Sequence, residues 1–308
     1  MTEKIGIIDL GTNTFHLLLA EVRGHTSRIF YRERQAVKIG RGGINQGVIT
    51  EDALERALTC IHHFKNVIDR EKVFRVQAFA TSAFRSAANG QEVIRKIRLQ
   101  TGIEVDMISG DQEAEYIYHG VRTAMDLRQE NSLIVDIGGG SVEFIIGNGE
   151  NFIWKNSFDI GAQRLLEQYQ KHDPMLPREI VDLQNHYELC LRPLHEAMQQ
   201  FNPRILVGSS GTFDTLSEIY CNRNHIVYST EATESPLTIP GFYEIHNEII
   251  GKNRAERMNM KGMIEMRVDM IVVASCLIHY LLTHFVFNNI RVSAYSLKEG
   301  ALARLAEL

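Results

Sequence analysis

The alternation of apolar and polar positions predicts the same series of elements twice along the chain. In each half, three strand-like apolar runs come first, and helices and further strands follow them. The first half is expected to contain strands at 5–9, 15–22, 28–35, 73–80 and 104–108, and helices from Thr50, at 91–100 and after Gly110. Strands that alternate with helices are typical of α/β proteins.

The second half begins in the same way. Its predicted strands lie at 133–136, 142–147, 151–157, 204–207 and 290–292, and its predicted helices start near Ala162, Arg178, Gly211, Glu265 and Leu297, with a loop at 236–241. The helix expected at 265–285 overlaps the most apolar stretch of the chain, 271–287. This stretch is shorter than the roughly 20 residues that a membrane span requires, so we expect a buried helix and no membrane contact.

Two such series imply a duplicated α/β fold with two domains and an interdomain cleft. The boundary is expected in the polar segment before the second series, which divides the chain into residues 1–128 and 129–308. The last helix, 297–308, is expected to pack back on the first domain.

A short motif is shared by the two halves. Residues 5–20 read IGIIDLGTNTFHLLLA and residues 132–147 read SLIVDIGGGSVEFIIG, at a constant offset of 127 residues. In both, an Asp ends a strand and a turn of glycines and small polar residues leads into a second apolar run, which predicts a β-hairpin. Such a turn presents N–H groups to an anion, and the Asp can hold a metal ion or its water. The candidate phosphate ligands of the two turns are Gly11, Thr12, Asn13, Thr14, Gly138, Gly139, Gly140 and Ser141.

Glycines also form tight turns that bind nothing, but such turns require neither a preceding Asp nor hydroxyl groups. A second candidate is Arg85, which follows a strand and lies among small residues, as suits bidentate phosphate binding or simply a helix start. A third is the strand–helix junction with Ser209, Gly211 and Thr212, which could bind phosphate or ribose or only cap its helix.

Acidic residues gather at 111–115, where a helix is expected to begin. Carboxylates in a first helical turn usually complement the helix dipole. Glu113 is of further interest because the next strand leads to Asp136, and a carboxylate near phosphate and Mg²⁺ can orient and deprotonate water. Arg267 and Asp269 lie where the long apolar helix should begin, and an ion pair is the simplest interpretation of both.

Composition and charge narrow the function classes. The net charge of −5 gives no global basic field, so no nucleic-acid partner is expected. The four cysteines form no CxxC pair, which favours buried thiols in a reducing cytoplasm over disulfides or a zinc site. The first residues lead directly into a strand without a signal peptide. Because two-fold dimers are the commonest assemblies, a homodimer is one expected state.

Together these segments resemble the exopolyphosphatase/guanosine pentaphosphate phosphohydrolase (Ppx/GppA) family, which is grouped with actin, sugar kinases and chaperone ATPases. The resemblance covers essentially the whole chain and implies a duplicated ribonuclease H-like, actin-like ATPase fold. It rests on IDLGTNTFHLL from Ile8, ATSAFRSAAN from Ala80, ISGDQEAEYIYHGV from Ile108, VDIGGGSVEF from Val135, VGSSGTFDTL from Val207, RVDMIVVA from Arg267 and VSAYSLKEGAL from Val292.

This resemblance implies Mg²⁺-dependent hydrolysis of a terminal phosphoanhydride bond. It makes Glu113 the catalytic carboxylate, Arg85 a phosphate ligand, and Asp9, Asp136 and Glu143 the metal-binding carboxylates. The implied substrate is inorganic polyphosphate or guanosine pentaphosphate, and the sequence does not choose between them. The sequence departs from the family pattern at Gln112, where an acid is common, at Lys298, where Arg is usual, and at Thr12 and Thr14, where Ser is frequent.

Long family members continue with further helical domains, whereas this sequence stops at Leu308, so processive binding of very long polyphosphate is not expected. Two other functions fit the scaffold. A kinase or ATPase would need an adenosine pocket and an acceptor site. A sensor of polyphosphate or of guanosine tetra- or pentaphosphate would bind without turnover, and the carboxylates at 113, 136 and 143 argue against it.

Overall fold

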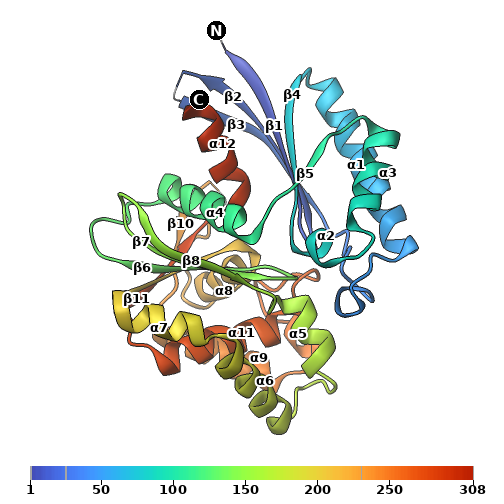
Figure 1. The fold of residues 1–308 in the computed structure, drawn as a ribbon. Helices are drawn as coiled ribbons and strands as arrows, with labels where there is room; N and C mark the ends of the chain where they lie inside the picture. Colours follow the sequence, from blue (N-terminus) through green and yellow to red (C-terminus); the bar gives the residue numbers. More distant parts are fainter. Residues whose placement is uncertain (1, 25, 230, 308) are drawn as a thin grey trace.

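A computed structural model describes residues 2–24, 26–229 and 231–307. The first half forms one sheet with helices on both faces. Its strands and first helices are drawn in blue and cyan in Figure 1. Its elements are β1 (Glu3–Leu10), β2 (Phe15–Arg23), β3 (Thr26–Gln35), the 3₁₀ turn η1 (Ile44–Gln46), α1 (Glu51–Arg70), β4 (Arg75–Ala80), α2 (Ser82–Ser86), α3 (Gly90–Thr101), β5 (Val105–Met107) and α4 (Gly110–Ala124).

The second half forms a second sheet below the first in Figure 1, with a thicker helical layer on its outer face. Its elements are β6 (Ser132–Ile137), β7 (Val142–Gly147), β8 (Phe152–Phe158), α5 (Ala162–Tyr169), α6 (Pro177–Cys190), α7 (Arg192–Phe201), β9 (Ile205–Ser209), α8 (Ser210–Arg223), β10 (Glu234–Ser235), α9 (Ile239–Gly251), α10 (Arg254–Met258), α11 (Ile271–His284), β11 (Asn289–Ser293) and α12 (Leu297–Glu307).

The two sheets have the same strand order, which confirms the predicted duplication. The first runs β3-β2-β1-β4-β5, and the second runs β8-β7-β6-β9-β11 with the short β10 added at its edge. In both, an antiparallel hairpin leads the sheet and the later strands join in parallel. Both phosphate-loop hairpins form as predicted, with Asp9 opposite His16 and Asp136 opposite Glu143. This order is that of the ribonuclease H-like fold.

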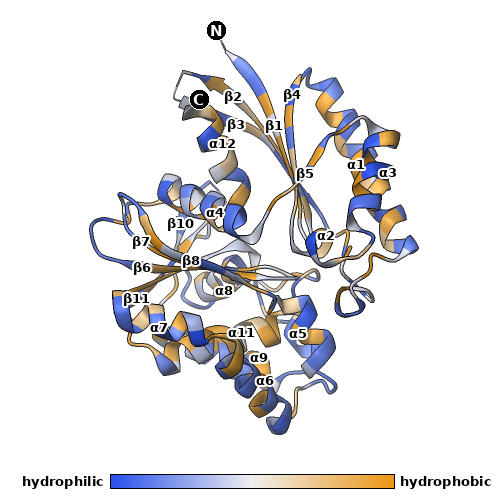
Figure 2. Ribbon diagram, in the orientation of Figure 1, coloured by the Kyte–Doolittle hydropathy of each residue, from blue (hydrophilic) through white to orange (hydrophobic). Residues whose placement is uncertain are grey.

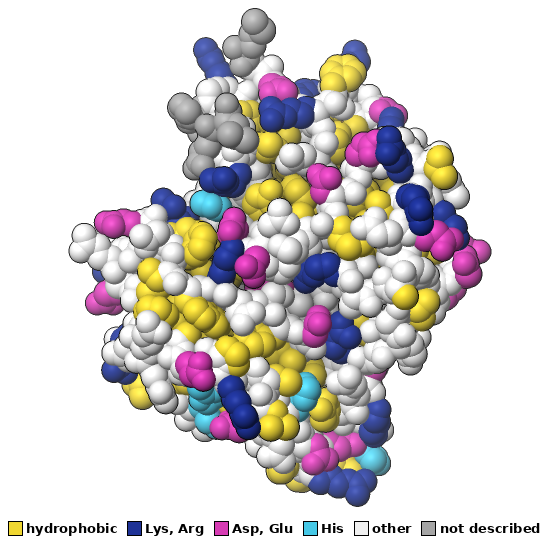
Figure 3. All heavy atoms as spheres, in the orientation of Figure 1, with side chains coloured by type: hydrophobic (Ala, Val, Ile, Leu, Met, Phe, Trp, Pro, Cys, Tyr) yellow, Lys and Arg dark blue, Asp and Glu magenta, His cyan; other side chains and the backbone are white. Residues whose placement is uncertain are grey.

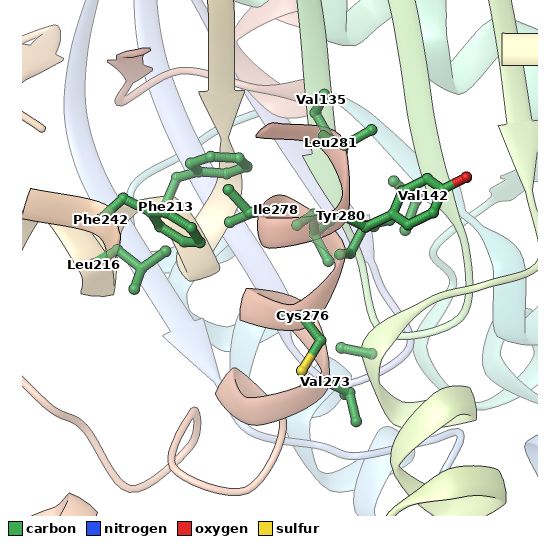
Figure 4. Close-up of a cluster of buried hydrophobic side chains, with 14 of the residues drawn as sticks. Val135, Val142, Phe213, Leu216, Phe242, Val273, Cys276, Ile278, Tyr280 and Leu281 are labelled. Atoms are coloured by element: carbon green, nitrogen blue, oxygen red, sulfur yellow. The ribbon is translucent and has the colours of Figure 1, made fainter. Parts of the chain in front are cut away.

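Each sheet packs its helices through an apolar core. Figure 2 shows that apolar and polar residues alternate around these helices, as expected for helices buried on one side. In the second half, Phe213 and Leu216 of α8 and Phe242 of α9 gather near Ile278 of α11 (Figure 4). None of the described helices is both long and apolar enough to cross a membrane.

Helices α4 and α12 lie between the two sheets and share one apolar cluster with both (Figure 1). The C-terminal helix therefore returns to the first half, against α4 and the strands beside it. The two helices cross at Gly120 and Gly300, where a Cβ on Gly300 would overlap the carbonyl oxygen of Tyr116. The division of the chain at residue 128 stays a prediction; α4 ends at Ala124 and β6 begins at Ser132.

Two predicted elements are wrong at one boundary. The long helix expected from Glu265 begins only at Ile271, because residues 265–270 form turns and not regular helix. The loop expected at 236–241 covers only 236–238, because α9 begins at Ile239. Thr238 caps that helix by accepting a hydrogen bond from the N–H of Gly241 at 3.1 Å, and Pro240 fits its first turn.

Candidate active site

A cavity of about 80 Å³ lies where the two hairpin turns face each other between the halves. Its walls come from the ends of β1 and β6, from the turns after them, and from the starts of α2, α4, α8 and α12. Of the predicted site residues it is lined by Asp9, Gly11, Thr12, Asn13, Thr14, Glu113, Asp136, Gly138, Gly139, Gly140 and Ser141. Residues more than 120 positions apart in the sequence thus surround one small space.

The two turns have the same geometry. A Cβ on Gly11 would lie 2.9 Å from the carbonyl oxygen of Thr14, and a Cβ on Gly138 would lie 2.9 Å from that of Ser141. Real Cβ atoms do not approach so closely, so both turns require glycine at this position. The duplicated motif therefore builds the same tight turn twice.

The turns also touch across the cleft. A Cβ on Gly140 would lie 2.6 Å from both the Thr12 hydroxyl and the Ser82 hydroxyl, and a Cβ on Gly139 would overlap the Asn13 amide. A larger residue at either glycine would force these side chains to shift. The glycines of the second turn thus permit close approach of the first.

Serine hydroxyls orient the carboxylates of the second hairpin. The two oxygens of Asp136 each accept a hydrogen bond of 2.6 Å, one from Ser209 and one from Ser210. Oε1 of Glu143 accepts from Ser141 at 2.6 Å and from Ser157 at 2.7 Å, which leaves Oε2 for another partner. Both side chains are therefore held in fixed orientations without any pairing to a cation.

Glu113 enters the cavity from the first turn of α4. Its carboxylate forms an ion pair with Arg85, whose Nη1 lies 2.8 Å from Oε2 and also donates to the carbonyl of Ile108 at 3.1 Å. The helix start is fixed by Ser109, which accepts from the N–H of Gln112, while Gln112 Oε1 accepts from the N–H of Ser109. Gln112, where the family usually has an acid, thus completes a capping box.

Burial strongly shifts the protonation of these carboxylates. It raises the pKa of Glu113 to about 7, although the neighbouring Arg85 opposes the shift. It raises the pKa of Asp9 to about 7, with Lys298 opposing and Glu113 and Asp136 adding to the rise. It also raises the pKa of Asp136 and, well above its usual range, that of Glu143. A bound cation would relieve the mutual repulsion of these groups.

The donor set suits a magnesium ion held partly by other oxygens. Among the residues that the structure describes, no three His, Cys, Asp or Glu side chains converge as a complete metal cage. Mg²⁺ usually keeps several waters and is bound by one or two carboxylates together with substrate phosphates. Asp9 and Asp136 line the cavity and can offer it carboxylate oxygens, whereas Glu143 lies opposite Asp136 on β7 and does not line it.

Several buried polar atoms at the cavity have no partner in the described structure. Asn13 Oδ1, Ser82 Oγ and Arg267 Nε are buried without a hydrogen bond, and all three residues line the cavity. Buried polar groups are normally paired, so these atoms are poised for a ligand. Unpaired polar atoms in three residues around one cavity favour a highly polar occupant.

Arg267 was not among the predicted ligands. The interpretation as an ion pair with Asp269 is wrong, because Asp269 pairs with Arg254 at 3.0 Å. Arg267 instead turns inward, and its guanidinium lies so close to the first turn of α8 that a Cβ on Gly211 would overlap it. The motif RVDMIVVA is part of the family resemblance, but the motif alone does not show where the Arg267 side chain points.

The junction after β9 contributes differently from the prediction. Ser209 supports Asp136, Gly211 packs beneath Arg267, and Thr212 is buried in α8. The residue of this junction that lines the cavity is Ser210, in a left-handed backbone conformation with φ of +70°. Direct phosphate contacts from Ser209, Gly211 and Thr212 stay a prediction, as do those from Arg85.

The described geometry belongs to a known class of protein. The model of the Ppx/GppA phosphatase family matches residues 18–308, so the chain belongs to this family. A crystal structure of an exopolyphosphatase from Cytophaga hutchinsonii is 42% identical, with a TM-score of 0.96 over 99% of this chain and 98% of that one. A Ppx/GppA family member from Aquifex aeolicus has the same fold, with a TM-score of 0.80 over 99% and 98% of the two chains at 24% identity.

One curated relative is a bifunctional 3-dehydroquinate synthase/phosphatase from Fusobacterium nucleatum subsp. nucleatum. It is 29% identical in an alignment 308 positions long that covers 96% of this chain. The chain spans only 45% of that protein, so the match concerns one part of a longer molecule.

Proposed function

We propose that this protein is a Mg²⁺-dependent hydrolase that releases the terminal phosphate of inorganic polyphosphate. The observation that carries the proposal is the placement of Glu113 in a cavity walled by two opposed phosphate-binding turns. The similarity to the Cytophaga hutchinsonii exopolyphosphatase supports this activity and this substrate. The four cysteines are free and mostly buried, which supports a reducing cytoplasm as the location.

The terminal phosphoryl group would lie between the two turns, with their N–H groups on its oxygens. Arg267 would neutralise charge beside it, and Arg85 would do so once the substrate competes with Glu113 for its guanidinium. Glu113 takes a proton from a water that attacks phosphorus, while the bond from phosphorus to the bridging oxygen breaks and its electrons leave with the shortened chain. Catalysis is then mostly positioning and electrostatic stabilisation.

Asp9, Asp136 and Glu143 are the residues that would hold Mg²⁺, in part through water. The ion would supply positive charge to the phosphate oxygens as negative charge shifts toward the leaving group. Burial is the main cause of the raised pKa values of these carboxylates, and Glu113 and Asp136 add to the rise for Asp9 and Glu143. A cation bound beside them would favour their charged forms, which supports the assignment.

A second substrate is favoured by one observation. A neighbouring cavity of about 360 Å³ shares His16 with the first and is lined by Tyr228, Tyr295, Asp214 and Lys298. Aromatic rings beside polar groups suit a nucleoside, so guanosine pentaphosphate is the second candidate. A kinase acting from the same cavity would need a second acceptor, and transfer of label from ATP to that acceptor would support it.

Phosphate release should be measured in parallel from medium-length polyphosphate, guanosine pentaphosphate and ATP, with Mg²⁺ and with a chelator. We expect release from polyphosphate that stops when the metal is removed and that returns when Mg²⁺ is added. The variant Glu113→Gln is the control for contaminating phosphatases. Tight binding with no release from any substrate would reject the hydrolase and favour a sensor.

The reaction should show an acid limb near neutral pH. Glu113 must be unprotonated to act as a base, and burial places its pKa at about 7. As pH falls below this value, kcat/KM should fall about tenfold per unit, because the fraction of free base falls. Raising Mg²⁺ should shift the limb to lower pH, since a nearby cation favours charged carboxylates.

Arg85→Gln provides the matched test of this pH profile. The guanidinium lowers the pKa of Glu113, so its loss should move the acid limb to higher pH. Profiles of kcat/KM for both proteins give the comparison. An acid limb that stays at the same pH in the variant would contradict the assignment of that limb to Glu113.

A further inference from the structure

The two phosphate turns are each held from behind by another segment. The first turn is held by the loop after β3, where the N–H of Lys38 donates to the carbonyl of Asn13 at 2.8 Å. The N–H of Gly40 donates to the carbonyl of Thr12 at 3.0 Å. This loop therefore fixes the position of the first turn from outside the cavity.

The second turn is held in the same way by the start of α5. The N–H of Ala162 donates to the carbonyl of Gly138 at 2.9 Å, and that of Gln163 donates to the carbonyl of Gly139 at 2.8 Å. These are first-turn N–H groups that a helix cannot satisfy internally. Each phosphate turn thus moves with its own supporting segment.

Arg164 joins these supports to each other. From α5, its Nε donates to the carbonyl of Gly140 at 3.1 Å, and its Nη1 crosses the cleft to the carbonyl of Ile44 at 3.1 Å. Its Nη2 donates to Ser86 Oγ at 3.3 Å, at the end of the helix that carries Arg85. Only 12% of the side chain is exposed. One planar guanidinium therefore links the second turn, the support of the first turn and the helix of Arg85.

A surface network around Arg164 reinforces the link between the halves. Asn45 Nδ2 donates to the carbonyl of Arg164 at 3.1 Å and to Glu167 at 3.3 Å, and Gln168 donates to Asn45 at 3.1 Å. The N–H of Gly42 also donates to Glu167, at 3.1 Å. Figure 1 shows the loop around η1 lying next to α5 at this edge of the molecule.

We propose that Arg164 is a positioning residue that sets the spacing of the two phosphate turns and of Arg85 when the cleft is closed. We place it outside the substrate site, because Arg164 does not line the cavity. Besides the three bonds above, its Nη2 lies 3.5 Å from Asp159 Oδ1. Its effect on turnover rests on the proposed function, whereas its effect on the closed arrangement does not. Without the hydrogen bonds of Arg164, each turn can change its position together with its own half of the molecule.

Arg164→Met keeps much of the side-chain length and removes the donors. We expect kcat/KM for polyphosphate to fall about 10²-fold, because displacement of catalytic groups by about 1 Å has effects of that order. KM should rise as well, since the same turns bind the ground state. Arg164→Lys should recover only part of the activity, because an ammonium cannot reach three acceptors in one plane. Arg178→Met, at an exposed position of α6, is the matched control.

Hydrogen exchange of the same variants tests the link without any catalysis. In Arg164→Met, amides of residues 38–46 and 138–141 should exchange faster than in the wild type, while α1 and α11 stay unchanged. Equal exchange in the two proteins, or faster exchange with unchanged kcat/KM, overturns the proposal. If the wild type released no phosphate, the proposed function would fail while this comparison still decided the role of Arg164.

A second variant covers the case in which Arg164→Met does not fold. Asn45→Ala removes hydrogen bonds to α5 from a half-exposed position, so it leaves the apolar cores intact. Faster exchange at 38–46 is expected here too, to a smaller extent. Exchange identical to that of the wild type would overturn the proposal.

Discussion

Glu113→Gln is expected to lower phosphate release about 10²–10⁴-fold, the usual effect of removing a general base. Glutamine keeps the shape of the side chain and can still contact Arg85, but it cannot accept a proton from water. Glu113 is only 8% exposed, so water from bulk solvent does not easily take over its role as the base. Initial rates with saturating polyphosphate and Mg²⁺ provide the measurement.

Glu115→Gln is the matched control on the same helix. Glu115 points away from the cavity and pairs with Lys155, and its side chain is 44% exposed. We expect its rate to equal that of the wild type, because exposed ion pairs contribute little. A Glu113→Gln variant as active as Glu115→Gln would remove Glu113 from the mechanism.

Gly300→Ala is expected to destabilise the protein by about 3 kcal/mol or more, at the upper end for overpacking. The added Cβ would overlap the carbonyl oxygen of Tyr116 and lie 2.7 Å from the N–H nitrogen of Gly120. Both contacts are with backbone of α4, so no side-chain rotation relieves them. The helices must separate, and the apolar cluster between the two sheets would open with them.

Gly251→Ala is the control, because a Cβ on Gly251 meets nothing within 4 Å and this residue ends helix α9. There the substitution should be neutral or slightly stabilising, as alanine favours helices by about 1 kcal/mol over glycine. Urea unfolding of both variants gives the comparison. Equal midpoints would show that the crossing of α4 and α12 tolerates a methyl group.

The part of the site that the sequence predicts is local in character. Each hairpin turn is encoded within a few residues, so Asp9, Asp136 and the glycines after them could be recognised from pattern and spacing alone. The duplicated strand order followed from the repeat of these hairpins. Glu113 was a candidate because the strand after its helix leads to Asp136, and only the family resemblance implied its catalytic role.

The parts that were missed depend on contacts between distant segments. Arg267 lines the cavity from a segment of turns before α11. The apolar spacing predicted a continuous helix from Glu265, so it gave no sign of these turns. Ser210 enters the cavity through a left-handed backbone that serine rarely adopts. Arg164 binds Ile44, 120 positions away, and no local pattern reports such a distance.

The return of α12 between the sheets has a consequence for biosynthesis. Ser296 and Leu297 line the same cavity as the turn after β1, so its walls come from opposite ends of the described chain. A ribosome that has reached only β11 has produced both phosphate turns but not this wall. The nascent chain therefore cannot complete its anion site, and assembly waits for one of the most distant contacts in the molecule.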